Sequence, residues 1–278
     1  MHRNDTRLQI YLLLIIAILL VITLICAATL GVLSLIPTPD PTEDTTEIPS
    51  ASEEDTPASV TPEEVLMGET EDAGITYIDK MIFFGESTTA HLRSRGVLSG
   101  GRDTTQVWED DSGTKTLSSK LLSETVNYPP TGEKLTLAQA LEKEQPDYIV
   151  LSFGLNSISG FINNKSTYVN NYNRLINAIQ AASPNTRIIL QTVYPVTAAC
   201  DAWKESGEEI CEYTRTLNQW LLEIAAAHEN VRVVDTASVL TDANGCLHAS
   251  YDYNGDGIHL TTEAYEKILH YLRTHAWE

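Results

Sequence analysis

Basic residues are scarce in this chain of 278 residues: 18 Lys and Arg stand against 38 Asp and Glu, a formal net charge of −20. Binding to nucleic acid requires a basic face, and no segment supplies one, so we expect no nucleic-acid partner. Cysteine is also scarce, and the spacing of the four present resembles no zinc site. We therefore expect neither a metal nor another cofactor, and any chemistry must come from ordinary side chains.

Charge is absent altogether from Ile10 to Ile36, a run of 27 residues rich in Leu and Ile. As a helix this run is longer than the roughly 30 Å hydrocarbon core of a bilayer, so it predicts a transmembrane anchor over residues 10–36. Arg3 and Arg7 precede it and acidic residues follow, which places residues 1–9 in the cytoplasm and the remainder outside the cell membrane. A cleaved signal peptide is the alternative, although its apolar region is usually about 7–15 residues long.

Lys and Arg are also absent from residues 37–75, which contain twelve Asp or Glu and many Pro, Thr and Ser. Too few large apolar residues are present to offset the entropy of ordering the chain, so we expect a disordered stalk. The folded domain is then expected over residues 76–278, in an extracytoplasmic location that permits a disulfide. Cys200 and Cys211 bracket a polar stretch, and a bridge between them is the pairing that we expect.

Within residues 76–278, apolar runs of strand length alternate with segments of helical periodicity. Continuous rather than alternating apolarity is typical of parallel strands covered on both faces. The pattern predicts a doubly wound α/β fold, a three-layer α/β/α flavodoxin-like sandwich with a mostly parallel sheet of about five strands. The expected strands are Lys80–Gly85, Thr104–Trp108, Asp147–Gly154, Arg187–Tyr194 and Val231–Asp235, with helices around Tyr168–Ile179, Leu217–Ala225 and Thr262–His275.

Reactive side chains follow three of these strands, and in doubly wound sheets ligands bind beyond the carboxyl ends of the strands. Ser87 follows a G-E turn and would open the next helix, where N–H groups favour a developing anion; a simple helix cap is the alternative. Asn156 follows G-L, and its amide would either stabilise an oxyanion or form a turn. Asp256 and His259 precede the last helix, and of the seven histidines only His259 has both an adjacent acid and a strand-end setting.

Together, the blocks G-E-S-T-T, G-L-N-S and D-G-I-H resemble, in this order, those of the SGNH (GDSL-type) hydrolase superfamily. The resemblance implies Ser87 as the nucleophile, His259 as the general base and acid, and Asp256 as its orienting carboxylate. It also implies an oxyanion hole made by the backbone N–H of Ser87, the Asn156 amide and a glycine after the second strand, for which Gly113 is the best match.

Three positions depart from the family pattern: Glu86 replaces the usual Asp, Thr88 a common Leu and Ser157 a frequent Asp. None of them removes a catalytic group. The implied activity is that of a membrane-anchored, extracytoplasmic serine esterase that hydrolyses a small ester, for example an O-acyl group on a carbohydrate. A surface O-acyltransferase and a catalytically silent relative are the alternatives. Candidates for stacking a sugar ring are Trp108, Trp203, Tyr251 and Tyr253.

The stretch D-Y-N-G-D-G-I-H-L-T-T-E, from Asp252 to Glu263, also matches the calcium-loop pattern at every specified position. A calcium-binding or adhesive module is therefore a further hypothesis. An EF-hand needs an entering helix, but the residues before Asp252 are typical of turns, and His259 stands where an apolar residue is usual. We therefore interpret Asp252 and Asn254 as turn-formers, and Glu263 as a first-turn acid favoured by the helix dipole.

Overall fold

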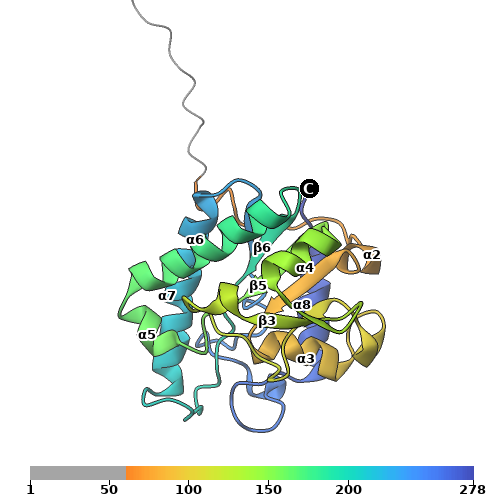
Figure 1. Cartoon of the computed structure of the whole chain (residues 1–278). Coiled ribbons are helices and arrows are strands. Elements are labelled where there is room, and N and C mark those ends of the chain that lie inside the picture. The colour runs from red at the N-terminus through yellow and green to blue at the C-terminus, as the bar shows by residue number, and fades with distance from the viewer. Residues whose placement is uncertain (1–60) are drawn as a thin grey trace, which may run out of the picture. The chain divides into compact units, whose positions relative to one another are not determined.

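The computed structural model describes residues 61–278 (Figure 1). The predicted cytoplasmic segment 1–9, the predicted anchor 10–36 and residues 37–60 of the predicted stalk lie outside these residues and stay predictions. Between residues 61 and 278, no helix combines the length and the apolarity needed to cross a membrane.

Five parallel strands form the central sheet, in the order β2–β1–β5–β6–β7. Each lies within a run predicted as a strand, which confirms the α/β fold with a mostly parallel sheet. The sheet extends in both directions from the boundary between β1 and β5, with β2 on one side and β6 and β7 on the other. In sheets of this kind ligands bind in the crevice at that boundary. The bounds are Met81–Gly85 for β1, Val107–Trp108 for β2, Tyr148–Ser152 for β5, Arg187–Gln191 for β6 and Val231–Val234 for β7.

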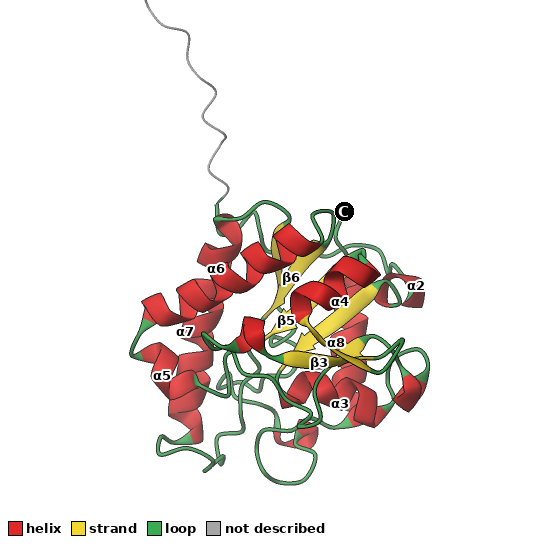
Figure 2. Cartoon of the chain, in the orientation of Figure 1, coloured by secondary structure: helices red, strands yellow, loops and turns green. Residues whose placement is uncertain are grey.

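Helices cover both faces of this sheet, which gives three layers (Figure 2). Successive strand residues point to opposite faces. Ile82 and Phe84 of β1 therefore share a hydrophobic cluster with α4, α5, α6 and α7, whereas Met81 and Phe83 share one with α2, α3 and α8. The bounds are Ile75–Ile78 for α2, Ser87–Arg95 for α3, Leu137–Glu144 for α4, Ile158–Ile162 for α5, Lys165–Ala182 for α6, Gly207–Ala226 for α7 and Thr262–Thr274 for α8.

An antiparallel hairpin outside the central sheet, β3 (Thr125–Tyr128) and β4 (Glu133–Thr136), is missed by the sequence analysis. Its strands carry no continuous apolar run: β3 alternates buried and half-buried residues, and β4 has no fully buried residue. Short 3-10 helices lie at Gly101–Asp103 (η1), Leu121–Ser123 (η2) and Ala249–Tyr251 (η3).

The predicted stalk extends too far, because residues 61–75 pack against the folded domain. Val65 and Met67 are buried. The N–H of Met67 donates to the Val233 carbonyl at 2.8 Å, and the N–H of Val233 donates to the Val65 carbonyl at 2.9 Å. This short segment therefore covers the outer edge of β7. The acidic and proline-rich surroundings of V-L-M conceal its apolar character in the sequence, so the boundary predicted at residue 76 is wrong.

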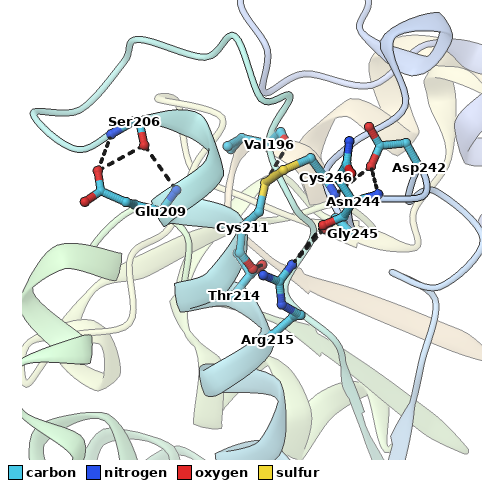
Figure 3. Close-up of a disulfide and its surroundings, with 10 residues drawn as sticks. All are labelled: Val196, Ser206, Glu209, Cys211, Thr214, Arg215, Asp242, Asn244, Gly245 and Cys246. Carbon is cyan, nitrogen blue, oxygen red and sulfur yellow. Dashed lines mark hydrogen bonds between the residues drawn. A yellow bond between two sulfur atoms is a disulfide. The ribbon is translucent and has the colours of Figure 1, made fainter.

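The predicted Cys200–Cys211 bridge is also wrong, because Cys211 of α7 pairs with Cys246 (Figure 3). The two Cα atoms lie 5.4 Å apart although 35 residues separate them in sequence. Cys200 is a buried free thiol whose sulfur lies 3.6 Å from the Asp256 carbonyl oxygen. Proximity in sequence suggested the first pairing, whereas the inward face of α7 presents Cys211 to the loop after β7.

Candidate active site

The candidate site lies at the carboxyl ends of β1 and β5, where the winding of the sheet reverses. β1 ends at Gly85, Glu86 follows in an extended conformation, and Ser87 is the first residue of α3. Gly85 has no room for a side chain, since a Cβ there would overlap the carbonyl oxygen of Ser152 at the end of β5. The glycine therefore allows the two strand ends to approach and places Ser87 at a helix N-terminus, where N–H groups lack helical partners.

Ser87, His259 and Asp256 lie in one line of hydrogen bonds. Ser87 Oγ is 3.2 Å from His259 Nε2, and His259 Nδ1 is 2.6 Å from Asp256 Oδ2. Asp256 Oδ1 accepts the N–H groups of Ile258 and His259 at 2.8 and 2.9 Å. Partial burial raises the pKa of Asp256, but these hydrogen bonds, led by that of the His259 ring, lower the pKa to about 2. The carboxylate is therefore ionised at neutral pH and oriented to accept the Nδ1 proton.

The His91 ring packs against the His259 ring, with centroids 4.6 Å apart. Its Nδ1 atom is buried and has no hydrogen-bond partner among residues 61–278. Burial lowers the pKa of His91 to about 4, and the electrostatic effect of the neighbouring His259 and Arg95 side chains acts in the same direction. A neutral ring therefore backs His259 at neutral pH. His91 is not among the site residues predicted from sequence, although its position one helical turn after Ser87 places both side chains on one face of α3.

Glu86 joins the two strand ends through a buried carboxylate, with 4% of the residue exposed. Its two oxygens accept the backbone N–H groups of Gly154 at 3.0 Å, Leu155 at 3.1 Å and Asn156 at 3.2 Å. Burial raises the pKa of Glu86 to about 7, against the opposing effect of these donors. The residue that departs from the family pattern thus holds the segment that carries Asn156, a role that its position beside Ser87 did not reveal.

The sequence profile of the GDSL-like lipase/acylhydrolase family matches residues 83–267. The chain belongs to this family. It is accordingly a GDSL-type ester hydrolase, and the resemblance drawn from the ordered motifs is confirmed. No curated protein matches this hydrolase.

Solved structures of low sequence identity resemble the hydrolase. A GDSL-like lipase of Bacteroides thetaiotaomicron is 19% identical, with a TM-score of 0.46 over 69% of this chain and 85% of that one. A carbohydrate esterase family 3 protein of Talaromyces cellulolyticus is 14% identical, with a TM-score of 0.43 over 69% and 93%. A family 3 carbohydrate esterase of Clostridium thermocellum is 17% identical, with a TM-score of 0.39 over 70% and 94%.

The Asn156 side chain lies against the loop that follows β2. Its Nδ2 atom is 3.2 Å from Thr114 Oγ1 and 3.3 Å from the Lys115 carbonyl oxygen. The N–H of Lys115 donates in turn to the Gly85 carbonyl at 3.1 Å. The loop after β2, the end of β1 and the segment after β5 are therefore connected directly around Ser87.

Gly113, the predicted oxyanion glycine, lies in this loop and lines a cleft together with Ser87. Its φ of 66° is in the left-handed region that favours glycine. The N–H of Gly113 donates to the Asp110 carbonyl at 3.0 Å and so closes a turn. That donor is already engaged, while the next residue, Thr114, lines the same cleft.

The cleft that contains Ser87 has a volume of about 620 Å³, and most of the residues that line it have polar or charged side chains. One wall is α3, which contributes Ser87, His91 and Ser94; Glu109 and the loop at 112–114 also line it. Arg93 is paired with Glu109 at 2.5 Å. A second cavity, of about 380 Å³, lies beside β7 and receives no side chain from the Ser87–His259–Asp256 line.

The stretch that matches a calcium loop forms a turn before α8. Asp252 accepts the N–H groups of Gly255 and Gly257, each at 3.0 Å, and Asn254 accepts that of Asp256 at 3.4 Å. Gly257 has a φ of 76°, and a Cβ there would overlap the Cys200 side chain. The contacts of Asp252 and Asn254 are those of turn-forming residues.

Proposed function

We propose that this hydrolase cleaves its ester with a Ser–His–Asp triad formed by Ser87, His259 and Asp256, through an acyl-enzyme. The observation that carries the proposal is the continuous hydrogen-bond line from Asp256 Oδ2 through the imidazole to Ser87 Oγ, at 2.6 and 3.2 Å. A serine hydroxyl becomes a useful nucleophile when a histidine accepts its proton and an acid fixes the tautomer of that histidine.

In the first step Ser87 Oγ attacks the carbonyl carbon of the ester while His259 Nε2 takes the hydroxyl proton. Asp256 keeps the other ring proton on Nδ1 and stabilises the imidazolium. The tetrahedral intermediate collapses, and the leaving alcohol receives its proton from His259. Water then attacks the acyl-enzyme with His259 again as the base, which releases the carboxylic acid and restores the serine.

Negative charge on the carbonyl oxygen requires donors that are already in place. The backbone N–H of Ser87 and the Asn156 amide are two candidates, as the family pattern implies. For the third we favour the N–H of Thr114 over that of Gly113, because the Gly113 donor is engaged with Asp110. Thr114 belongs to the loop that contacts Asn156 and lines the cleft with Ser87.

The substrate that we propose is an O-acyl group on a carbohydrate. Apart from Ala90, the side chains that line the cleft are polar or charged, and one of its residues is a glycine. A long aliphatic chain in the cleft would displace the water bound to these groups without replacing the hydrogen bonds that this water makes. A sugar presents hydroxyl groups that pair with them, so a short acyl group on a polar alcohol suits the cleft best.

We place the enzyme outside the cytoplasm, anchored by the uncharged segment 10–36. Arg3 and Arg7 before this segment and acidic residues after it support that orientation. The Cys211–Cys246 disulfide supports it independently, because structural disulfides persist in oxidising compartments.

Replacement of Ser87 by alanine tests the triad, with Ser94→Ala as the matched control on the same wall of the cleft. We expect the wild type and Ser94→Ala to hydrolyse 4-nitrophenyl acetate, and Ser87→Ala to lose about 10⁶ in kcat. Acetylated sugars with and without an added sugar acceptor distinguish release of free acid from transfer of the acyl group. Equal hydrolysis by the wild type and Ser87→Ala would refute the triad.

A further inference from the structure

Tyr253 is the residue among the four aromatic candidates whose ring is available to a ligand. Trp108 is buried in the core, and Trp203 and Tyr251 are partly buried against the two hydrophobic clusters. Tyr253 is 54% exposed, which makes it one of few large apolar side chains in residues 61–278 that face solvent. A single exposed aromatic side chain is common on protein surfaces, so what distinguishes Tyr253 is the position of its backbone next to that of His259.

The backbone of Tyr253 is fixed to that of His259. The N–H of Tyr253 donates to the His259 carbonyl at 2.8 Å, and the N–H of Thr261 donates to the Tyr251 carbonyl at 2.9 Å. Asp252 and Leu260 form an antiparallel bridge between these bonds. Tyr253 therefore belongs to the same short backbone bridge as His259.

Arg95 holds the Tyr253 ring in place from one side. Its guanidinium carbon lies 3.4 Å from the ring centroid, and its Nε donates to the Leu260 carbonyl at 3.3 Å. A cation over an aromatic face is attracted by the ring quadrupole. Arg95 thus covers one face of the Tyr253 ring, and the exposed part of the residue lies outside that face. The ring is therefore held in position before a ligand binds.

The distance from Ser87 determines which part of a substrate this ring meets. Ser87 and Arg95 are the first and last residues of α3, so they lie about 12 Å apart along the helix axis. The sugar that carries the scissile acyl group is held at Ser87. A ring stacked over Arg95 is therefore placed for a sugar unit linked to the acylated one.

We propose that the exposed part of the Tyr253 ring binds the apolar face of a neighbouring sugar ring, so that the substrate is an acylated oligosaccharide or polysaccharide. The negative face of an aromatic ring attracts the hydrogen atoms of the C–H groups on that sugar face. The inference rests on the proposed esterase function and adds the size of the carbohydrate to it.

The kinetic test uses the full-length chain with 4-nitrophenyl acetate, an acetylated methyl glycoside and the same acetylated sugar within a tetrasaccharide. We expect the wild type to prefer the tetrasaccharide over the glycoside by about three- to tenfold in kcat/KM, mainly through KM. Tyr253→Ala should abolish this preference, and Tyr253→Phe and Tyr253→Trp should retain it. Ile75→Ala, which removes an exposed apolar side chain at the start of α2, is the control that should keep it.

A binding test separates this inference from the esterase proposal. Calorimetry on the Ser87→Ala protein with xylotetraose, cellotetraose and chitotetraose should detect binding of at least one tetrasaccharide. In the double variant that also carries Tyr253→Ala, the Kd for that tetrasaccharide should be three- to tenfold higher. If no tetrasaccharide binds, or if Tyr253→Ala changes neither the Kd nor the preference, the stacking role is overturned. Absence of 4-nitrophenyl acetate hydrolysis with intact tetrasaccharide binding would instead refute the esterase proposal alone.

Discussion

Replacing Glu86 by glutamine tests whether this buried carboxylate positions Asn156. Its oxygens accept three backbone N–H groups, from Gly154, Leu155 and Asn156, at 3.0–3.2 Å. Glutamine keeps the size, but one terminal oxygen becomes an NH₂ group that faces N–H donors. At least one buried N–H group then loses its acceptor, at a cost of about 1–3 kcal/mol, so the segment is expected to move.

The movement should appear in kcat, because Asn156 is proposed to donate to the oxyanion only after the attack. Complete loss of one such donor costs about 10²–10³ in rate. The Asn156 amide also contacts the loop after β2, and these contacts should keep the amide partly in place in the variant. We therefore expect Glu86→Gln to lower kcat by about 10²-fold, the lower end of that range, with a smaller change in KM.

The same variant should change how stability depends on pH. Burial raises the pKa of Glu86 from its usual 4.5 to about 7. Between these values the folded protein keeps a proton that the unfolded chain has released, so the free energy of unfolding falls as pH rises from 4.5 to 7. The fall is about 3 kcal/mol for this group at 1.36 kcal/mol per pKa unit. Glu86→Gln cannot titrate and should lack this component.

The assay combines steady-state hydrolysis of 4-nitrophenyl acetate at pH 8 with urea unfolding at pH 5 and pH 7.5. Glu266→Gln, at an exposed position of α8, is the matched control and should behave as the wild type. The reasoning is refuted if Glu86→Gln keeps the wild-type kcat. It is also refuted if the wild type and this variant lose the same stability between the two pH values.

Three further perturbations address the histidine pair and the disulfide. Asp256→Asn removes the acceptor of the Nδ1 proton and should lower kcat by about 10⁴-fold; retained activity would argue against the triad. Cys211→Ser or Cys246→Ser should cost about 4 kcal/mol in urea unfolding for a bridge across 35 residues, whereas Cys200→Ser should cost less. The pKa of His91 is lowered to about 4, so the unfolded chain binds that proton first as pH falls below 6.5 and the free energy of unfolding decreases. His91→Leu should therefore lose less stability between pH 7 and pH 4.5 than the wild type.

The central sheet could be predicted from sequence because its strands are buried on both faces. β1 and β5 contain only buried residues, so the apolar runs in the sequence coincide with the strands. The same pattern led us to expect Ser87 and His259 to lie together, since parallel strands present their carboxyl ends at one edge of the sheet. Ser87 and His259, 172 residues apart in sequence, meet there at 3.2 Å.

Features that depend on one side chain meeting a distant partner could not be predicted in this way. The acceptor role of Glu86 depends on the separation of two strand ends, and the choice of Cys246 as the partner of Cys211 depends on how α7 faces the following loop. The packing of Val65 against β7 was hidden because acidic composition was averaged over the whole segment. Periodicity and composition describe a segment alone, whereas these contacts are set by the tertiary arrangement.

Three segments around Ser87 support one another: the end of β1, the loop after β2 and the segment after β5. Glu86, at the end of β1, holds the backbone that bears Asn156. The Asn156 amide contacts the loop after β2, and the N–H of Lys115 in that loop returns to Gly85, the last residue of β1. Each segment is thus held by the other two, so we expect a change in one of them to shift the others. Glu86, which stands where the family usually has Asp, reaches the segment after β5 with its side chain while its backbone stays next to Ser87.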